Sequence, residues 1–137
     1  MDTSRPLHIL LAHVWYWPHV GGGDQHVEQI GRELVSRGHK VTVWCADVPA
    51  HEERRFNRGG VDVVRIQPSR VLGGVDPLVS VSDLDLTDVD VVHLHDTLPV
   101  LIRRTLAKAR SAGKPVVTTY HNDYIKTTLA GKALKRL

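Results

Sequence analysis

The chain has 137 residues, of which 42% are hydrophobic and 24% are charged. This length and composition are typical of one globular domain with a single core, and they exclude disordered and fibrous proteins. The formal net charge of +3 and the isoelectric point near 9.2 suit a ligand that carries phosphate, but they do not select one. Only 5% of the residues are aromatic, and the aromatic-and-basic pattern of single-strand-binding proteins is missing. We therefore expect no nucleic-acid partner.

Cysteine usage and hydropathy indicate the compartment. Cys45 is the single cysteine, which excludes an intramolecular disulfide and a thiolate metal cluster. The first apolar run, residues 7–14, contains His8 and His13 and is much shorter than the ~20 apolar residues of a membrane-spanning helix. The sequence shows no secretory signal. These features favour a cytoplasmic protein in which residues 1–137 form one domain.

The first third of the chain predicts a strand, a helix and a second strand. Residues 7–12 form a near-continuous apolar run, which is typical of a strand buried on both faces of a parallel sheet. Apolar residues from Val27 to Val35 recur at helical spacing, and Gly38 follows them where a helix cap belongs. Residues 41–45 then supply the second buried strand.

The remaining segments continue this alternation. Residues 47–60 are polar and predict a surface loop before a third strand at residues 61–66, and residues 67–88 predict a long irregular connection with room for one short helix. A fourth strand at residues 89–94 precedes a helix for which Thr97 is the expected N-cap, with Pro99 in its first turn. The last predicted elements are a fifth strand at residues 115–120 and a basic helix over residues 124–137.

Strands that alternate with helices predict an α/β fold, a Rossmann-like doubly wound parallel sheet in three layers. We expect the strand order 3-2-1-4-5, which places the ligand crevice beyond the carboxyl ends of the first and fourth strands. Three unusual clusters lie at strand ends: residues 21–24, 93–96 and 121–123. The fold is expected to bring them together in this crevice.

The glycine loop Gly21-Gly22-Gly23-Asp24 stands directly before the first predicted helix. Glycines let the main chain approach a ligand closely, and the helix N-terminus offers unpaired N–H groups to a phosphate. The loop does not match the GxGxxG fingerprint, which disfavours an NAD enzyme. A glycine-rich turn that only starts the helix is an alternative interpretation.

Histidine and aromatic residues form two further candidate groups. His93 and His95 would face the same side of the fourth strand. Without a third ligand at a recognisable spacing, we favour a hydrogen-bonded pair at the crevice floor over a metal site. The aromatic residues 15–17 can either stack on a sugar or cover the sheet edge. The basic tail is either a solvated helix face or a contact with an anionic membrane surface.

Three segments resemble the N-terminal domain of family 4 glycosyltransferases. They are residues 18–43 (PHVGGGDQHVEQIGRELVSRGHKVTV), residues 88–96 (DVDVVHLHD) and residues 113–124 (GKPVVTTYHNDY). The family motif of a glycine pair, a small residue, Glu or Gln, any residue and His-Val matches Gly21, Gly22, Gly23, Asp24, His26 and Val27. Asp24 is one methylene shorter than the residue usual at its position.

The resemblance implies roles for particular residues. Gly21, Gly22, Gly23 and Asp24 are expected to lie against the donor diphosphate and the acceptor, and His121 to act as the catalytic residue beside the donor sugar. The residues that we also expect to line the crevice are Tyr16, His95, Asp96, Asn122, Asp123 and Lys126.

The resemblance also implies an activity. Such enzymes have the two-domain GT-B fold and transfer a hexose-type sugar from a UDP- or GDP-linked donor to an acceptor hydroxyl, with retention of configuration and without a metal ion or cofactor. The sequence lacks the motifs of the C-terminal nucleotide-binding domain, so we expect a truncated acceptor-side half that is inactive alone. Its expected partners are the nucleotide sugar, a sugar or lipid-linked acceptor, the missing domain and, through peripheral contact, the cytoplasmic face of a membrane. A stand-alone phosphate- or sugar-binding module and a purely structural domain remain alternatives.

Overall fold

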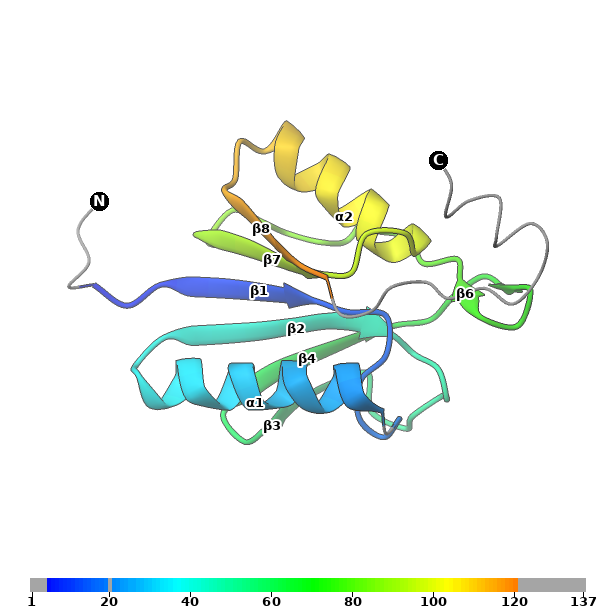
Figure 1. The fold of residues 1–137 in the computed structure, drawn as a ribbon, viewed down its shortest axis with the longest axis horizontal. Helices are drawn as coiled ribbons and strands as arrows, with labels where there is room; N and C mark the ends of the chain where they lie inside the picture. Colours follow the sequence, from blue (N-terminus) through cyan, green and yellow to red (C-terminus); the bar gives the residue numbers. More distant parts are fainter. Residues whose placement is uncertain (1–4, 20, 121–137) are drawn as a thin grey trace.

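The centre of the molecule is a six-stranded sheet, seen in a computed structural model that describes residues 5–19 and 21–120 (Figure 1). Its strands lie in the order β3-β4-β2-β1-β7-β8. Their bounds are β1 His8–Ala12, β2 Lys40–Ala46, β3 Arg55–Arg58, β4 Val61–Ile66, β7 Val91–His95 and β8 Val116–Thr119. A separate two-stranded sheet pairs β5 (Val71–Leu72) with β6 (Asp76–Pro77).

Two helices cover opposite faces of this sheet. α1 (Gly22–Ser36) packs with one core cluster, which contains Ile9 and Leu11 of β1. α2 (Val100–Ser111) packs with the other, which contains Leu10 and Ala12 of the same strand. Because successive side chains of a strand point to opposite faces, one short strand contributes to both cores. The expected three-layer, doubly wound α/β fold is confirmed.

The predicted order of the parallel strands is also confirmed. β1 pairs in parallel with β2 and β7, β2 pairs in parallel with β4, and β7 pairs in parallel with β8. Counted as the five predicted strands, this is the order 3-2-1-4-5. The winding therefore reverses between β1 and β7.

The sheet has one strand more than the sequence predicts. Arg55–Arg58 form β3, antiparallel to β4, within residues 47–60, where the prediction of a surface loop was wrong. Gly59 and Gly60 have φ angles of 62° and 86°, the geometry of a tight two-residue hairpin turn. Phe56 packs against the core on the α1 side, so one apolar residue in a polar run was the available signal for this edge strand.

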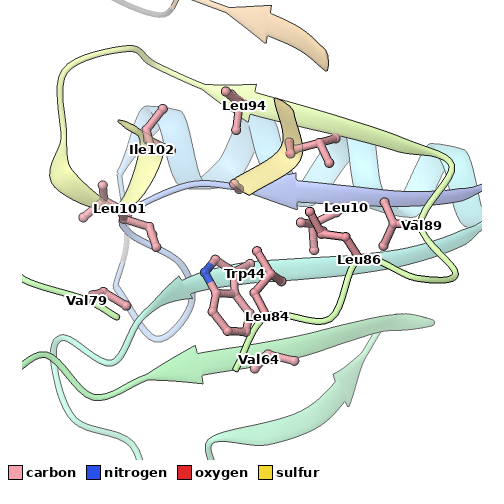
Figure 2. Packing of buried hydrophobic residues seen from close by; sticks show 14 of the residues in the cluster. Leu10, Trp44, Val64, Val79, Leu84, Leu86, Val89, Leu94, Leu101 and Ile102 are labelled. Atoms are coloured by element: carbon pink, nitrogen blue, oxygen red, sulfur yellow. The ribbon is translucent and has the colours of Figure 1, made fainter. Parts of the chain in front are cut away.

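The long connection after β4 also differs from expectation. In place of a short helix, residues 67–88 contain the β5–β6 hairpin, which projects beyond the carboxyl ends of the parallel strands (Figure 1). Residues further along pack onto the α2 face, where Trp44 and Leu84 lie close together (Figure 2). Buried apolar side chains anchor this irregular segment, among them Val79, Leu84 and Leu86. Apolar burial, and not regular secondary structure, holds it in place.

The start of α2 depends on the same hairpin. The helix begins at Val100 with Pro99 at the N-cap position, so the prediction of Thr97 as the cap was wrong. The backbone N–H of Val100 donates to the Asp76 carboxylate, with an N–O distance of 3.2 Å. Since Pro99 has no capping side chain, a carboxylate from 24 residues earlier satisfies this helix terminus.

A buried arginine ties together the loops at the carboxyl edge of the sheet. Arg65, in β4, is only 1% exposed. Its Nε donates to Oδ1 of Asp47 at 2.9 Å, and its two Nη atoms each donate at 2.7 Å, to the carbonyl oxygens of Trp17 and Pro49. Burial alone would raise the pKa of Asp47, but the hydrogen bonds and charge of Arg65 outweigh it and hold that pKa below its usual value. The loops that follow β1 and β2 are therefore fixed to β4.

Substitution of Arg65 tests how much its hydrogen bonds to these loops stabilise the fold. Arg65→Met keeps a long side chain but leaves the buried Asp47 without its main partner, so we expect the free energy of unfolding to fall by about 3–5 kcal/mol. Urea denaturation followed by circular dichroism measures the change. The exposed Arg55 provides the control, because Arg55→Met is expected to change stability by about 0.5 kcal/mol or less.

Should Arg65→Met fail to fold, the double variant Arg65→Met/Asp47→Leu still tests the pair. Removing both charges also removes the uncompensated carboxylate, so part of the lost stability should return. Equal stability of Arg65→Met and Arg55→Met would contradict the role assigned to Arg65.

Candidate functional site

A cavity of about 560 Å³ opens beyond the carboxyl ends of β1 and β7. Its walls come from the loop after β1, the start of α1, the β5–β6 hairpin and the segment between β7 and α2. The lining residues are His13, Val14, Trp15, His19, Gly21, Gly23, Asp24, Val75, Asp76, His95, Asp96, Leu98 and Pro99. The cavity lies at the reversal of strand order, where open α/β sheets bind their ligands.

Five of the predicted site residues meet at this cavity: Gly21, Gly23, Asp24, His95 and Asp96. Gly22 lies between two of them but does not line it. The predicted residues His121, Asn122, Asp123 and Lys126 lie outside the described residues. The structure thus brings together two of the three expected clusters, and the prediction for the third stays a prediction.

Tyr16 does not belong to the site as expected. We predicted that it lines the crevice, but its side chain is 1% exposed and packs in the α1-side core with Val27. Burial raises the pKa of its phenol to about 12. Its neighbour Trp15 lines the cavity instead, so of these two aromatic residues one serves the core and the other the site.

Asp24 is held by two histidines from the loop after β1. It is 5% exposed, and its Oδ1 lies 3.2 Å from Nε2 of His13. Its Oδ2 is hydrogen-bonded to Nδ1 of His19. Burial alone would raise the pKa of Asp24, but the hydrogen bonds from His13 and His19 outweigh it, and the pKa lies below its usual value. An ionised carboxylate only accepts hydrogen bonds, so both imidazoles act as donors here.

His95 forms the floor of the cavity with its histidine neighbours. It is fully buried, and its ring centroid lies 4.2 Å from that of His93 and 6.1 Å from that of His13. Nε2 of His93 lies 2.7 Å from the hydroxyl oxygen of Thr119 in β8. The predicted arrangement of His93 and His95 on one side of the strand is confirmed. Over residues 5–19 and 21–120, no group of three or more His, Cys, Asp or Glu side chains is arranged to hold a metal ion.

Asp96 forms part of the cavity rim in an unusual backbone conformation. Its φ angle is +87°, in the left-handed region that non-glycine residues rarely adopt. Its backbone N–H donates to the carbonyl of Thr119 at 2.8 Å, and its Oδ1 accepts from the N–H of Thr97 at 2.9 Å. These bonds hold a conformation that costs on the order of 1–3 kcal/mol, and such strain is concentrated at functional sites.

The charge of the cavity is one-sided. Asp24, Asp76 and Asp96 line it, and within the described part of the chain no Lys or Arg does. The positive character available to an anion comes from α1, because Gly21 at its N-cap position provides no side-chain cap for the N–H groups of the first turn. The cavity therefore combines a helix terminus whose uncapped N–H groups suit an anion with walls that suit neutral, hydroxyl-bearing groups.

Sequence reasoning missed several lining residues. His13 directly follows the first strand and His19 stands two residues before the glycine loop, so their positions beside predicted site elements were the available signal. Val75 and Asp76 come from a hairpin in the segment with the poorest pattern, and no local signal marked them.

The chain resembles known proteins in two comparisons, one with a family profile and one with individual sequences. The profile described as Glycosyltransferase Family 4 matches residues 20–137. The chain is 28% identical over 133 residues to a phosphatidylinositol N-acetylglucosaminyltransferase subunit of Arabidopsis thaliana, an alignment that covers 90% of this chain and 29% of the relative. The protein of the same name in Homo sapiens is 22% identical over 143 residues, covering 96% of this chain and 29% of the relative. The chain thus spans less than a third of the length of these relatives.

Insertion into a membrane would require a long apolar helix. No helix in the described ranges is both long and apolar enough to cross a membrane.

The two glycines at the start of α1 have different surroundings. A Cβ at Gly23 would lie 3.0 Å from Nε2 of His13, whereas a Cβ at Gly22 would meet no atom within 4 Å. We expect Gly23→Ala to lower the free energy of unfolding by about 1–3 kcal/mol, because it displaces the His13 ring from Asp24. Gly22→Ala is expected to leave stability unchanged or raise it by up to about 1 kcal/mol. Urea denaturation of both variants measures this, and equal losses would contradict it.

The low pKa of Asp24 predicts how the site titrates. His13→Phe removes one hydrogen bond to Asp24 but keeps its burial, so the pKa of Asp24 should rise. A carbon-detected NMR titration of the carboxyl group measures this, with His8→Phe at the other end of β1 as the control. Because the folded-state pKa is lowered, the stability that Asp24 contributes is present above its unfolded pKa of about 4 and is lost as the pH falls through the folded value. An unchanged Asp24 titration in His13→Phe would contradict this account.

Proposed function

Because this chain belongs to glycosyltransferase family 4, we propose that it forms the acceptor-side part of a retaining glycosyltransferase. Such an enzyme moves a sugar from a UDP- or GDP-linked donor to an acceptor hydroxyl. The observation that carries this proposal is the cavity at the reversal of strand order, where Gly21, Gly23 and Asp24 meet the end of β7. The nucleotide-binding part belongs to a second domain, and the chain alone is inactive.

The donor diphosphate lies against the N-terminus of α1. The first-turn N–H groups and the positive end of the helix dipole suit its charge. The open space around Cα of Gly22 is compatible with this placement, since a side chain there would meet no protein atom and the main chain is accessible to a ligand. No metal ion or cofactor takes part in this proposal, and groups of the second domain share the diphosphate charge.

The acceptor occupies the cavity. Trp15 and Leu98 offer apolar surface, and the carboxylates of Asp24, Asp76 and Asp96 disfavour an anionic group between them. These walls suit the neutral, polyhydroxylated part of a headgroup. Both relatives are named for transfer of N-acetylglucosamine to phosphatidylinositol. We extend that class to this chain as a lipid-linked acceptor reached at the cytoplasmic face of a membrane.

Sugar transfer then depends on positioning and charge. The cavity and the helix terminus hold the acceptor hydroxyl and the diphosphate on one side of the anomeric carbon, as retention requires. The new bond forms from the acceptor oxygen, the bond to the diphosphate breaks, and the leaving oxygen takes the acceptor proton. The catalytic role that the resemblance implies for His121 stays a prediction, because this residue lies outside the described residues.

Ligand mapping on the ¹⁵N-labelled chain tests the proposal. UDP-N-acetylglucosamine should shift the amide signals of Gly22 and Gly23, and myo-inositol should shift those of Trp15 and Asp96, with millimolar affinity. Gly22→Val should abolish the nucleotide-sugar shifts and preserve the inositol shifts.

Three results would contradict the proposal in different ways. Shifts confined to residues far from the cavity would remove the acceptor and donor sites. Steady release of UDP by the chain alone would show that it is more than half of an enzyme. Micromolar binding of a nucleotide or sugar phosphate, lost in Gly22→Val, would instead indicate a stand-alone binding module.

A further inference from the structure

His19 has an unusually defined orientation for a loop histidine. Its Nδ1 is hydrogen-bonded to the buried Asp24, and its ring stacks on Trp15 with centroids 5.1 Å apart and planes inclined by 27°. The side chain is 38% exposed and lines the cavity. Two independent contacts therefore fix the ring, one through its edge and one through its face, in a position open to a ligand.

The contact with Asp24 also decides which ring nitrogen carries the proton. Asp24 is ionised at neutral pH, because its pKa lies below the usual value, and a carboxylate accepts hydrogen bonds only. Nδ1 of His19 must then be the donor, so that in the neutral form of the ring the lone pair lies on Nε2. Since the two nitrogens point in diverging directions, Nε2 is directed away from Asp24. No hydrogen-bond partner for Nε2 is found among the described residues.

Asp24 itself is poorly placed to contact a ligand. Both of its oxygens are engaged, and only 7% of its side chain is exposed. The resemblance puts a longer Glu or Gln at this position, and the aspartate here stays behind the histidine rings. Of these two side chains that line the cavity, His19 is the more exposed, at 38% against 7% for Asp24.

We propose that Nε2 of His19 accepts a hydrogen bond from a hydroxyl group of the acceptor, and that Asp24 is the positioning residue behind it. This assignment rests on the proposed acceptor role of the cavity. The group that contacts Nε2 is a neutral polyol, because Nε2 of a neutral imidazole offers a lone pair and no proton. The nearby carboxylates of Asp24, Asp76 and Asp96 disfavour an anion at the same point.

Nitrogen NMR of the histidine rings tests the assignment directly. In the chain labelled with ¹⁵N-histidine at pH 7.5, His19 should show a protonated Nδ1 and an unprotonated Nε2. Addition of myo-inositol should shift the Nε2 signal of His19. Asp24→Asn should abolish the single tautomer, since an amide no longer requires Nδ1 to be the donor. A purely structural histidine would not respond to the polyol.

Two asparagine variants separate the role of Nε2 from general packing. His19→Asn keeps a donor beside Asp24 at the place of Nδ1 but removes Nε2, and it should weaken myo-inositol binding about fivefold. His51→Asn is the matched control. His51 is also a loop histidine packed on a tryptophan, with its centroid 5.1 Å from that of Trp17, and it does not line the cavity. Its loss should leave inositol binding unchanged.

The contrary outcomes distinguish failure of the His19 assignment from failure of the proposed acceptor role. A protonated Nε2 on His19, or inositol shifts at Trp15 and Asp96 with an unmoved His19 nitrogen, overturns this assignment and leaves the acceptor cavity intact. Equal binding by His19→Asn and wild type does the same, provided that both unfold at the same urea concentration. If myo-inositol shifts no residue of the cavity, the proposed acceptor role fails and this assignment fails with it.

Discussion

The guanidinium of Arg65 is the interaction on which the carboxyl edge of the sheet depends. It pairs with Asp47 and donates to the carbonyl oxygens of Trp17 and Pro49, so the loops after β1 and β2 share one buried donor. Irregular loops bury few apolar side chains of their own and are held by such polar contacts. Because the loop after β1 runs directly into the glycine segment, the position of the site follows from this tie.

Charge organises the site itself. A single buried carboxylate, Asp24, receives hydrogen bonds from His13 and His19, and each ring thereby acquires a defined orientation and a defined donor nitrogen. The missing side chain of Gly23 leaves just enough room for His13 beside the helix. The same helix start thus offers N–H groups to an anion on one side and oriented imidazoles to a neutral ligand on the other. This division suits the donor diphosphate and the hydroxyl-bearing acceptor that we propose.

Local patterns predicted the main elements of the sheet and the edge at which residues 21–24 meet His95 and Asp96. They did not reveal β3, where Phe56 is one apolar residue among charged ones, or the hairpin that delivers Asp76 to the start of α2. Tyr16 and Trp15 are adjacent aromatic residues that the sequence does not distinguish, yet Tyr16 is buried in the core and Trp15 lines the cavity. Whether a loop side chain points into the core or into the cavity follows no periodic pattern in the sequence.

The sequence by itself determined the strand order and the edge that carries the site, because apolar periodicity marks buried strands and helices and the handedness of their crossovers is nearly invariant. Only the tertiary structure decided which side chains meet there. Asp24 with His13, Asp47 with Arg65 and Asp76 with Val100 are paired across 11, 18 and 24 residues. Such pairs form because a buried charge or helix terminus must be satisfied by whatever group the folded chain brings near it.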